Sequence, residues 1–431
     1  MTAIPGPTAP ASLQTARWLA RPIRFLEDNR RRYGDAFTVM FKGFKTPLVI
    51  VSHPSVLRAL YGERGHLMPP GRQVTLKPLV GARSLLLLEG DEHLSRRKVM
   101  LPPFRGDRMR AYEPIMRDAS ARELAAWPVG RAFAVHPSMQ SITLDVILQA
   151  VFGVSDEARR ARLHQLLADL LAATTSMSLQ VQVLFGRMAP LEALQRQAGE
   201  IDALLLEEIA ARRTSPGADI CSLLVQARFE DGTGMSDGEI RDQLMTLLMA
   251  GHETTATGLA WTLDLLVRHP AVLERARTGD ETYLKAVVSE SLRLRPVVPL
   301  AGRRLAAPLA VDGISLPEGT DVTPAIWLAH TREDSYPEPF AFRPERFLEE
   351  GPDTYAWIPF GGSVRRCIGG AFAEFEMRIV LREVLTRCEL HKSDPAPERV
   401  ARRNVTLSPR DGTRVVLSAR HPAREGELLA A

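Results

Sequence analysis

One apolar segment constrains the fold of this chain more than any other. The residues from Ser236 to His269 follow helical periodicity, and nearly every residue from Leu244 to Ala250 is apolar. Ser236 and Glu239 stand at capping-box spacing, which predicts where the helix begins. About 30 residues at a rise of 1.5 Å each make a rod of roughly 50 Å. Because its middle is apolar on all sides, this helix must cross the interior, and the rest of the fold must surround it.

The composition is that of an ordinary globular protein, with 45% hydrophobic and 25% charged residues. A length of 431 residues allows two or three domains, but no linker rich in Pro, Gly or Ser divides the middle. We therefore expect one domain over residues 21–419, after a flexible proline-containing segment (1–20) and before a tail (420–431). The net charge of +4, without basic runs interleaved with aromatics, argues against nucleic acid as a partner.

Strand-like segments are few and lie near the ends of the chain, at Phe37–Phe41, Leu48–Val51, Leu309–Leu316 and Val415–Leu417. Almost everything from residue 91 to residue 294 follows helical patterns. The sequence therefore predicts a mainly α fold with small peripheral β-sheets.

The three cysteines (Cys221, Cys367 and Cys388) are too few and too scattered for a disulfide framework, which favours a reducing compartment. The N-terminus lacks the layout of a signal peptide. No window approaches the roughly 20 apolar residues of a membrane span. We expect a soluble, cytoplasmic protein.

One of these cysteines has surroundings that suit a metal ligand. Cys367 lies near the end of the glycine-rich loop 360–369, after two arginines and before a helical pattern. Cations and a helix N-terminus stabilise a thiolate. A buried structural cysteine is the alternative for the loop taken alone, and zinc is excluded because no second Cys or His stands at zinc spacing. We interpret Cys367 as the axial thiolate of a haem iron, a ligation that favours O–O cleavage.

The middle of the long helix carries residues that are unusual inside a helix, Gly251, Glu253 and Thr254. Glycine costs about 1 kcal/mol relative to alanine there, and a buried carboxylate is costly without a partner. Such departures from local rules tend to mark functional sites. Gly251 and Thr254 would let the helix widen into a groove for a small ligand, and Glu253 with Thr254 would pair an acid and a hydroxyl for proton delivery.

Helical spacing places Leu247, Ala250 and Thr254 on one face, which we predict lies over the haem. His252 points elsewhere and is expected to be a hydrogen-bonded core histidine. Without the cysteine loop, a helix kink or a cap would be the simpler interpretation of this motif.

Together, the loop and the helix motif resemble the cytochrome P450 family of haem-thiolate monooxygenases, in particular soluble bacterial and actinobacterial members. The likeness spans roughly residues 24–417, with five motifs in the family's usual order. It implies haem b as cofactor and O2 as co-substrate, with Phe360 shielding the sulfur of Cys367 and Gly369 letting the next helix pass close to the porphyrin. Ser363 departs from the pattern, because most members carry glycine there, and serine is costly if φ is positive.

The resemblance also implies that Thr254 hydrogen-bonds iron-bound dioxygen and that Glu253 belongs to the proton path. Buried haem carboxylates need cationic or hydrogen-bonding partners. The residues that match the family's positions for this task are His93, Arg97, Arg303 (with Arg304 as the fallback) and Arg365. His93 and Arg97 stand four apart and so share a helix face.

A further match is structural. Glu290 and Arg293 stand three apart on one helix, and the family joins such a pair to an arginine at the position of Arg346. This cluster would lock the cysteine loop onto the core. A buried pair of this kind loses several kcal/mol when one partner is removed.

Segments that line the substrate pocket in relatives are apolar here, although each could equally be ordinary core. The pocket candidates are Leu87, Leu247, Ala250, Val298, Leu300 and Leu407, with the segment 179–183. Such walls favour a hydrophobic substrate, and a fatty acid, terpenoid, steroid or polyketide would each fit as the molecule that is hydroxylated or epoxidised.

No flavin, nicotinamide or iron–sulfur signature follows the cysteine loop. We therefore expect a monomer that takes electrons from a separate ferredoxin or flavodoxin with its reductase. The candidate docking patch for this partner consists of Arg366, Arg378 and Arg382. Two alternatives stay open, a haem-thiolate peroxygenase or isomerase and a non-enzymatic haem sensor of a gas or lipid. Retention of Glu253 and Thr254 argues against the first.

Overall fold

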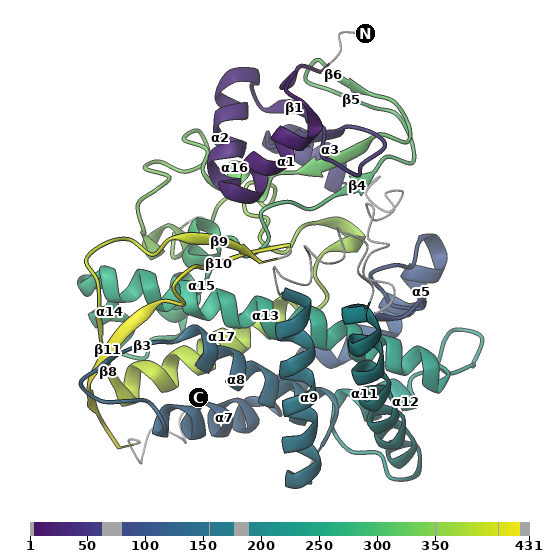
Figure 1. Cartoon of the computed structure of the whole chain (residues 1–431), viewed down its shortest axis with the longest axis vertical. Helices are drawn as coiled ribbons and strands as arrows, with labels where there is room; N and C mark the ends of the chain where they lie inside the picture. Colours follow the sequence, from purple (N-terminus) through teal and green to yellow (C-terminus); the bar gives the residue numbers. More distant parts are fainter. Residues whose placement is uncertain are drawn as a thin grey trace.

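The long helix lies at the centre of the molecule, as the sequence predicts. The computed structural model describes residues 4–62, 80–154, 156–175, 189–349, 351–403 and 405–422. Helix α13 (Asp237–Arg268) crosses the body in Figure 1. Ser236 and Glu239 form the reciprocal capping box, and His269 is the C-cap. Most of the helix is buried, so its predicted position and burial are confirmed.

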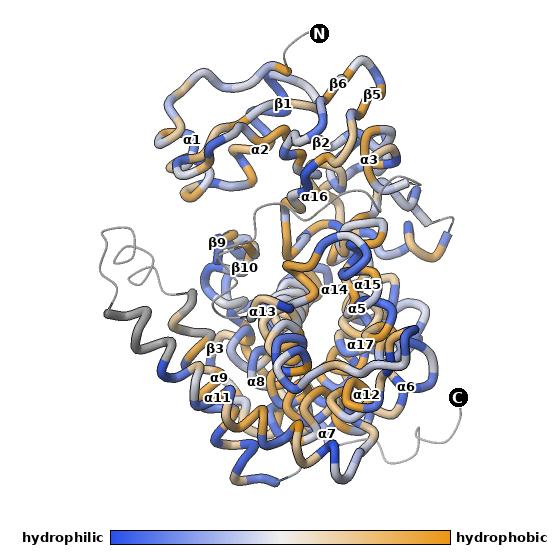
Figure 2. Tube along the Cα trace, turned by 90° about the vertical axis from the view of Figure 1, so that its right-hand side faces the viewer, coloured by the Kyte–Doolittle hydropathy of each residue, from blue (hydrophilic) through white to orange (hydrophobic). Residues whose placement is uncertain are grey.

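The other large helices pack around α13. Helices α8, α11, α15 and α17 contact it directly, and α7 packs on α8 and α17. In Figure 2, hydrophobic residues recur along the helices gathered round α13. None of the helices in the described parts of the chain is long and apolar enough to span a membrane. The helices of this body are α5 (Gly90–Met100), α6 (Asp107–Arg110), α7 (Glu113–Ala125), α8 (His136–Val146), α9 (Glu157–Thr175), α11 (Ala189–Thr214), α12 (Ile220–Gln226), α14 (Pro270–Ala276), α15 (Glu281–Leu294) and α17 (Gly370–Arg387).

A smaller part of the molecule surrounds a four-stranded sheet of order β1-β2-β7-β4, in the upper region of Figure 1. Strand β2 runs parallel to β7, and the other pairs are antiparallel. Because β4 pairs with the buried strand β7, Arg303 of β4 is carried into the interior and is buried. The elements of this part are α1 (Ala11–Ala20), α2 (Pro22–Tyr33), β1 (Ala36–Val39), β2 (Leu48–Val51), α3 (Pro54–Tyr61), β4 (Arg303–Arg304), β7 (Asp321–Pro324) and α16 (Ile326–His330).

Three small sheets and four short turns of 3-10 or π-helix complete the described fold. One sheet has the order β3-β11-β8, and the other two are the hairpins β5-β6 and β9-β10. Their strands are β3 (Ala132–Ala134), β5 (Leu309–Val311), β6 (Ile314–Leu316), β8 (Cys388–Lys392), β9 (Val400–Arg403), β10 (Thr406–Pro409) and β11 (Arg414–Arg420). The turns are η3 (Pro102–Phe104), η4 (Ile147–Val151), η5 (Pro344–Phe347) and η6 (Ser363–Arg365).

The mainly α architecture and the predicted strands are confirmed, but the prediction missed several short strands. Strand β3 lies inside the segment that was expected to be almost wholly helical. It spans three residues and pairs with residues 414–416 of β11. A strand that short carries little local signal, because its pairing partner lies far away in the sequence.

The N-terminal segment carries structure that the sequence analysis did not expect. Residues 11–20 form helix α1 rather than a flexible lead-in. The side-chain oxygen of Gln14 accepts a hydrogen bond from the backbone N–H of Met40 at 2.9 Å, and Thr38 N donates to Pro5 O at 2.8 Å. These bonds tie the segment to strand β1 and the residue that follows it.

Candidate active site

The glycine-rich loop folds back on itself and places Cys367 just before helix α17. The backbone N–H of Cys367 donates to the carbonyl of Phe360 at 2.9 Å. Two residues of the loop have left-handed backbone conformations, Gly361 with φ of 68° and Ser363 with φ of 57°. Serine is costly in this region, by about 1 kcal/mol, because its Cβ crowds the next carbonyl oxygen. The loop therefore keeps the backbone shape that glycine would favour at residue 363 and carries some strain there.

Cys367 is an exposed residue, although its thiol group is closely surrounded by protein atoms. Burial raises the pKa of this thiol, while the N–H of Gly369 and the charges of Arg97 and Arg366 lower it. Burial is the largest influence, so the expectation of a lowered pKa is wrong for the thiol by itself. The groups that would stabilise a thiolate are nevertheless present, and binding to a metal ion would deprotonate the sulfur.

Small residues around the loop leave room where the family expects a porphyrin. A Cβ atom built on Gly369 would meet no atom within 4 Å outside its own neighbourhood. By contrast, a Cβ on Gly370 would lie 3.2 Å from the ring of Phe360, so this ring packs against the first turn of α17. A Cβ on Gly362 would clash with the ring of Tyr61 at 2.5 Å. Two aromatic rings therefore pack directly against glycines of this region, and the space beside Gly369 stays open.

The four predicted anchoring residues come together from three parts of the fold. His93 and Arg97 lie on α5, Arg303 on β4 and Arg365 in the cysteine loop. Burial lowers the pKa of His93 to about 4, helped by the charges of the three arginines. Burial and the charge of Arg303 lower the pKa of Arg365 to about 10. Positive charge is therefore concentrated here at an energetic cost, and a bound dianion such as the two haem carboxylates would relieve it.

The fallback residue Arg304 is engaged elsewhere. Its guanidinium pairs with Asp321 at 2.9 Å, and its side chain is 42% exposed. Arg303, next to it, is buried and lies close to Gly361 of the loop. The geometry therefore favours Arg303 over Arg304 as the anchoring residue.

Tyr61, at the end of α3, belongs to the same neighbourhood and was missed by the sequence analysis. Its ring packs on Gly362, and Arg303 acts electrostatically on its hydroxyl. The hydroxyl is buried, and no described residue hydrogen-bonds to it. Orphaned buried donors are rare and point to a missing partner. A lone tyrosine at the end of a short helix has no local pattern that could have revealed this position.

One face in the middle of α13 is accessible, although most of the helix is buried. Ala250 is exposed, and Leu247 and Thr254 are half-buried, whereas Leu244, Leu248 and Leu259 are fully buried. The three residues that helical spacing placed on one face are all at least partly accessible, and Met249, Gly251 and Glu253 beside them are half-buried as well. The structure therefore shows an accessible strip along the middle of the central helix, as the haem-facing prediction requires.

The unusual residues of α13 do not interrupt it, since the helix is continuous from Asp237 to Arg268. The hydroxyl of Thr254 donates to the carbonyl of Ala250 at 2.5 Å. A Cβ on Gly251 would touch Ile147 at 3.4 Å, so this glycine lies where helix η4 approaches. The widening of the helix that was expected at Gly251 and Thr254 is therefore not seen as a break in the helix.

Glu253 and His252 point toward α8. The amide of Gln140 donates to Glu253 Oε2 at 2.5 Å. His252 is buried, and its Nδ1 lies 3.1 Å from the hydroxyl of Thr143. Burial lowers the pKa of His252 to about 4, so it is neutral at neutral pH. The expectation that His252 is a hydrogen-bonded core residue is confirmed.

The acid–arginine cluster is assembled as expected, with no solvent exposure for Glu290 or Arg293. Glu290 Oε2 accepts from Arg293 Nε at 2.6 Å, and Oε1 accepts from Arg346 Nε at 3.1 Å. Arg293 also donates to the backbone carbonyl of His330 at 2.8 Å. The ring of His330 in turn accepts from the backbone N–H of Ile358 at 2.9 Å, two residues before Phe360. This chain of bonds connects the cluster to the cysteine loop.

The predicted pocket residues differ in exposure. Leu87, Leu247, Val298 and Leu300 are half-buried, and Ala250 is exposed. Leu407 is only 3% exposed, and its backbone bonds to Val297 and Trp261, so it behaves as core. Residues 179–183 lie outside the described residues.

The arginines proposed for partner docking are mostly engaged. Arg378 pairs with Glu281 at 2.7 Å, and Arg382 pairs with the same carboxylate and with Glu113. Of the three, Arg366 is the exposed one.

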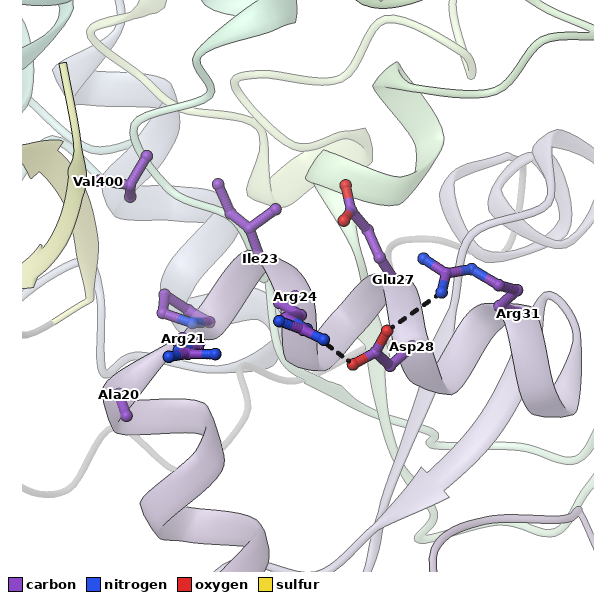
Figure 3. Close-up of a pocket in the computed structure, with 9 residues that line it drawn as sticks. Ala20, Arg21, Ile23, Arg24, Glu27, Asp28, Arg31 and Val400 are labelled. Carbon is purple, nitrogen blue, oxygen red and sulfur yellow. Dashed lines mark hydrogen bonds and ion pairs between the residues drawn. The ribbon is translucent and has the colours of Figure 1, made fainter. Parts of the chain in front are cut away.

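Another hollow on the surface is separate from these residues. Figure 3 shows it at the junction of α1 and α2, facing Val400 of β9. On α2, Asp28 pairs with Arg24 at 3.5 Å and with Arg31 at 3.3 Å. None of the predicted site residues lines this hollow.

The residues around Cys367 fit a haem. Four features occur together here: an exposed cysteine whose sulfur accepts from the N–H of Gly369, a concentration of basic side chains, a tyrosine hydroxyl without a partner among the described residues, and open space beside Gly369. Among the described residues, no group of three His, Cys, Asp or Glu side chains could hold a metal ion directly.

Comparisons with known proteins agree with this interpretation. The family model described as Cytochrome P450 matches residues 5–415. A Mycobacterium tuberculosis protein named cytochrome P450 135B1 is 40% identical over 438 residues, which cover 96% of this chain and 91% of that protein. Cytochrome P450 137 of the same organism is 38% identical, covering 95% and 90% of the two chains.

Solved structures share the fold. The retinoic acid-bound cyanobacterial CYP120A1 matches with a TM-score of 0.83 at 25% identity, over 96% of this chain and 99% of that one. The haem domain of cytochrome P450DA matches with a TM-score of 0.85 at 23% identity, over 97% and 98%. With a family model and relatives that span almost its whole length, the chain belongs to the cytochrome P450 family.

Proposed function

We propose that this protein is a haem-thiolate monooxygenase that hydroxylates or epoxidises a hydrophobic small molecule. The observation that carries the proposal is the pairing of an accessible cysteine, next to concentrated basic residues, with an open strip on the central helix that presents Thr254. Haem b, when bound, would supply the redox chemistry that activates O2 and splits its O–O bond.

The chain's own residues would bind the cofactor and manage protons. Cys367 would ligate the iron, with Phe360 packed beside the loop as a shield. The side chains that would hold the two carboxylates are those of His93, Arg97, Arg303 and Arg365. Such charge-assisted bonds are stronger than neutral ones and fix orientation as well as position.

Proton handling would fall to Thr254 and Glu253 on α13. The Thr254 hydroxyl lies on the open strip and donates to Ala250 O, so it can accept a hydrogen bond from a ligand or proton donor there. Glu253, one residue earlier, has a pKa raised by burial, which lets its carboxyl hold a proton nearer to neutral pH than an exposed glutamate can.

The substrate and the electron donor follow from the same surroundings. Half-buried aliphatic side chains at Leu87, Leu247, Val298 and Leu300 favour a hydrophobic substrate of the fatty acid, terpenoid, steroid or polyketide kind. A separate ferredoxin or flavodoxin would deliver electrons near the exposed Arg366. Three unpaired cysteines in the described structure suit a reducing compartment such as the cytoplasm.

The decisive test compares Thr254→Ala with Thr262→Ala. Thr262 is the matched control, because its hydroxyl also bonds to the carbonyl four residues earlier on α13, but it is fully buried. With a surrogate reductase, Thr254→Ala should keep haem and oxygen consumption but convert more of the consumed oxygen to hydrogen peroxide. Thr262→Ala should leave the yield of product per electron unchanged.

Unchanged coupling in Thr254→Ala would remove the proposed role of this hydroxyl. The absorption spectrum of the reduced, carbon monoxide-bound protein tests the ligand, since a histidine-type spectrum would contradict thiolate ligation. A protein that consumes no reductant beyond background would be a sensor, and one that works only with added peroxide would be a peroxygenase.

A further inference from the structure

Glu253 is held by a polar cluster that involves three elements of the fold. Gln140 and His136 come from α8, Thr257 lies one turn after Glu253 on α13, and Arg403 comes from strand β9. None of these four residues was singled out in the sequence. The carboxyl group itself is largely buried, with 16% of its side chain exposed.

The two carboxylate oxygens of Glu253 have different surroundings. Oε2 accepts from Gln140 Nε2 at 2.5 Å. Oε1 is buried and makes no hydrogen bond, although His136 Nε2 lies 3.8 Å away and Arg403 Nη1 lies 3.9 Å away. One oxygen is therefore fixed by a strong donor. The other has no hydrogen bond of good geometry, although Thr257 is close enough to act on the carboxylate, and it can take a proton or a new partner.

The charged and titratable groups that face this carboxyl are His136 from α8 and Arg403 from β9. His136 is 1% exposed and bonds to Thr257, and burial holds its pKa near 3, so it carries no charge at neutral pH. Arg403 is the member of the cluster that reaches solvent, with 36% of its side chain exposed. The positive charge that acts on Glu253 therefore comes from the β9–β10 hairpin.

We propose that Gln140 and Arg403 are positioning residues that hold the Glu253 carboxylate against α8 and on the β9 side of α13. The proposal rests on the proposed function, because it supposes that Glu253 gives up a proton toward Thr254 and regains one from solvent. Gln140 fixes the carboxylate after proton loss, since an amide N–H can donate to a carboxylate but gains less from a neutral acid. Arg403 stabilises the same charge from the solvent side, where the proton returns.

The arrangement explains why Glu253 and Thr254 are not bonded to each other here. Thr254 donates to Ala250 O on its own helix, and Glu253 bonds across to α8. To pass a proton to Thr254, the carboxyl group of Glu253 must first break its hydrogen bond to α8. Gln140 is the group from which Glu253 must turn away.

The first measurement is the pKa of Glu253 in the haem-loaded protein. The carbonyl stretch of the protonated acid can be assigned as the infrared difference between wild type and Glu253→Gln, and followed against pH. Gln140→Leu should raise the pKa of Glu253, because the bond that stabilises its ionised form is lost. Arg403→Gln should raise it less, since Arg403 acts only through its charge at 3.9 Å.

The second measurement is a double-mutant cycle on coupling, the ratio of hydrogen peroxide to product. Gln140→Leu should increase this ratio several-fold, and adding it to Glu253→Gln should cause no further increase, because Gln140 acts through Glu253. The matched control is Gln165→Leu on α9, which removes a surface amide–carboxylate bond to Asp169 and should change neither quantity.

The outcomes separate this inference from the proposed function. An unchanged pKa of Glu253 in both Gln140→Leu and Arg403→Gln would overturn the inference whatever the enzyme does. Equal increases in peroxide from Gln140→Leu with and without Glu253 would also overturn it, since Gln140 would then act structurally. The pKa of Glu253 could also rise in Gln140→Leu while Glu253→Gln shows a normal ratio of hydrogen peroxide to product. That result would refute the proton-delivery role of Glu253, and the inference with it.

Discussion

Replacing Glu290 by glutamine should greatly lower the free energy of unfolding of this protein, although the side chain keeps its size and shape. Glu290 is fully buried and accepts four hydrogen bonds through its two oxygens, two from Arg293, one from Arg346 and one from the backbone of Arg343. The amide keeps the size of the side chain but turns one oxygen into a donor that faces another donor. It also leaves the buried guanidinium of Arg293 without its counter-charge.

The magnitude follows from the burial of both partners. Removing one member of a buried pair costs about 3–5 kcal/mol, because the remaining charge is left uncompensated. A domain usually has only about 5–15 kcal/mol of stability in total. Arg293 keeps its bonds to the carbonyls of His330 and Pro339, at 2.8 and 2.7 Å, so the guanidinium stays in place and bears the whole penalty. Haem retention should fall as well, because His330 carries the connection to the cysteine loop.

Urea unfolding of the haem-loaded variant, followed by circular dichroism and by haem release, measures the effect. The matched control is Glu281→Gln, which removes a carboxylate that is 44% exposed from its pairs with Arg378 and Arg382. Pairs of that kind contribute about 1 kcal/mol or less. If Glu290→Gln lowers the free energy of unfolding by no more than this control, the cluster does not lock the loop, and the reasoning from burial fails.

Three other predictions each concern a single residue. Arg303→Gln should lower the haem content of the purified protein, whereas Arg304→Gln should not, because Arg304 is paired with Asp321; equal haem loss in both would contradict the assignment. Glu376→Gln should flatten the pH dependence of stability. Burial raises the pKa of Glu376 to about 8 in the folded state, so the folded protein holds a proton that the unfolded chain loses above its ordinary pKa of 4.5, and stability falls as pH rises between these values. Urea midpoints at pH 5 and pH 8 test this, and parallel profiles for variant and wild type would refute it. Ser363→Gly should leave stability unchanged or raise it by up to about 1 kcal/mol, because relief of the left-handed serine is offset by the entropy of glycine; a clear loss in thermal unfolding would show that serine is favoured there.

The sequence predicted those parts of the fold whose causes are local. The capping box at Ser236 and Glu239 and the apolar run that follows specify α13 almost to the residue. The pair Glu290 and Arg293 was visible because both stand on one helix. Short strands such as β3 were missed, because only a distant partner makes three residues a strand.

The same difference between local and long-range causes decided which site residues could be predicted from the sequence. Residues within recognisable motifs, such as Cys367 and Thr254, could be named from the sequence. Tyr61, Gln140 and Arg403 could not, because their meaning comes from what they face in three dimensions. The pKa of Cys367 was misjudged for a related reason. Neighbours in sequence indicated stabilising charges, but burial by distant parts of the chain outweighs them.

The two buried charge clusters of this protein differ in how well their charges are balanced. In the cluster of Glu290, Arg293 and Arg346, every strong charge has an opposite partner at hydrogen-bonding distance, so the cluster can hold the loop without any ligand. At the face of Cys367, basic side chains crowd one another. Burial and neighbouring positive charge lower the pKa values of His93 and Arg365, and Glu89 offsets the effect on Arg365 only in part. Acidic side chains thus neutralise the buried arginines of the first cluster, so a lack of acidic partners is specific to the face of Cys367. The concentration of positive charge beside the cysteine is therefore best explained as a seat for an anionic group that the protein has to bind.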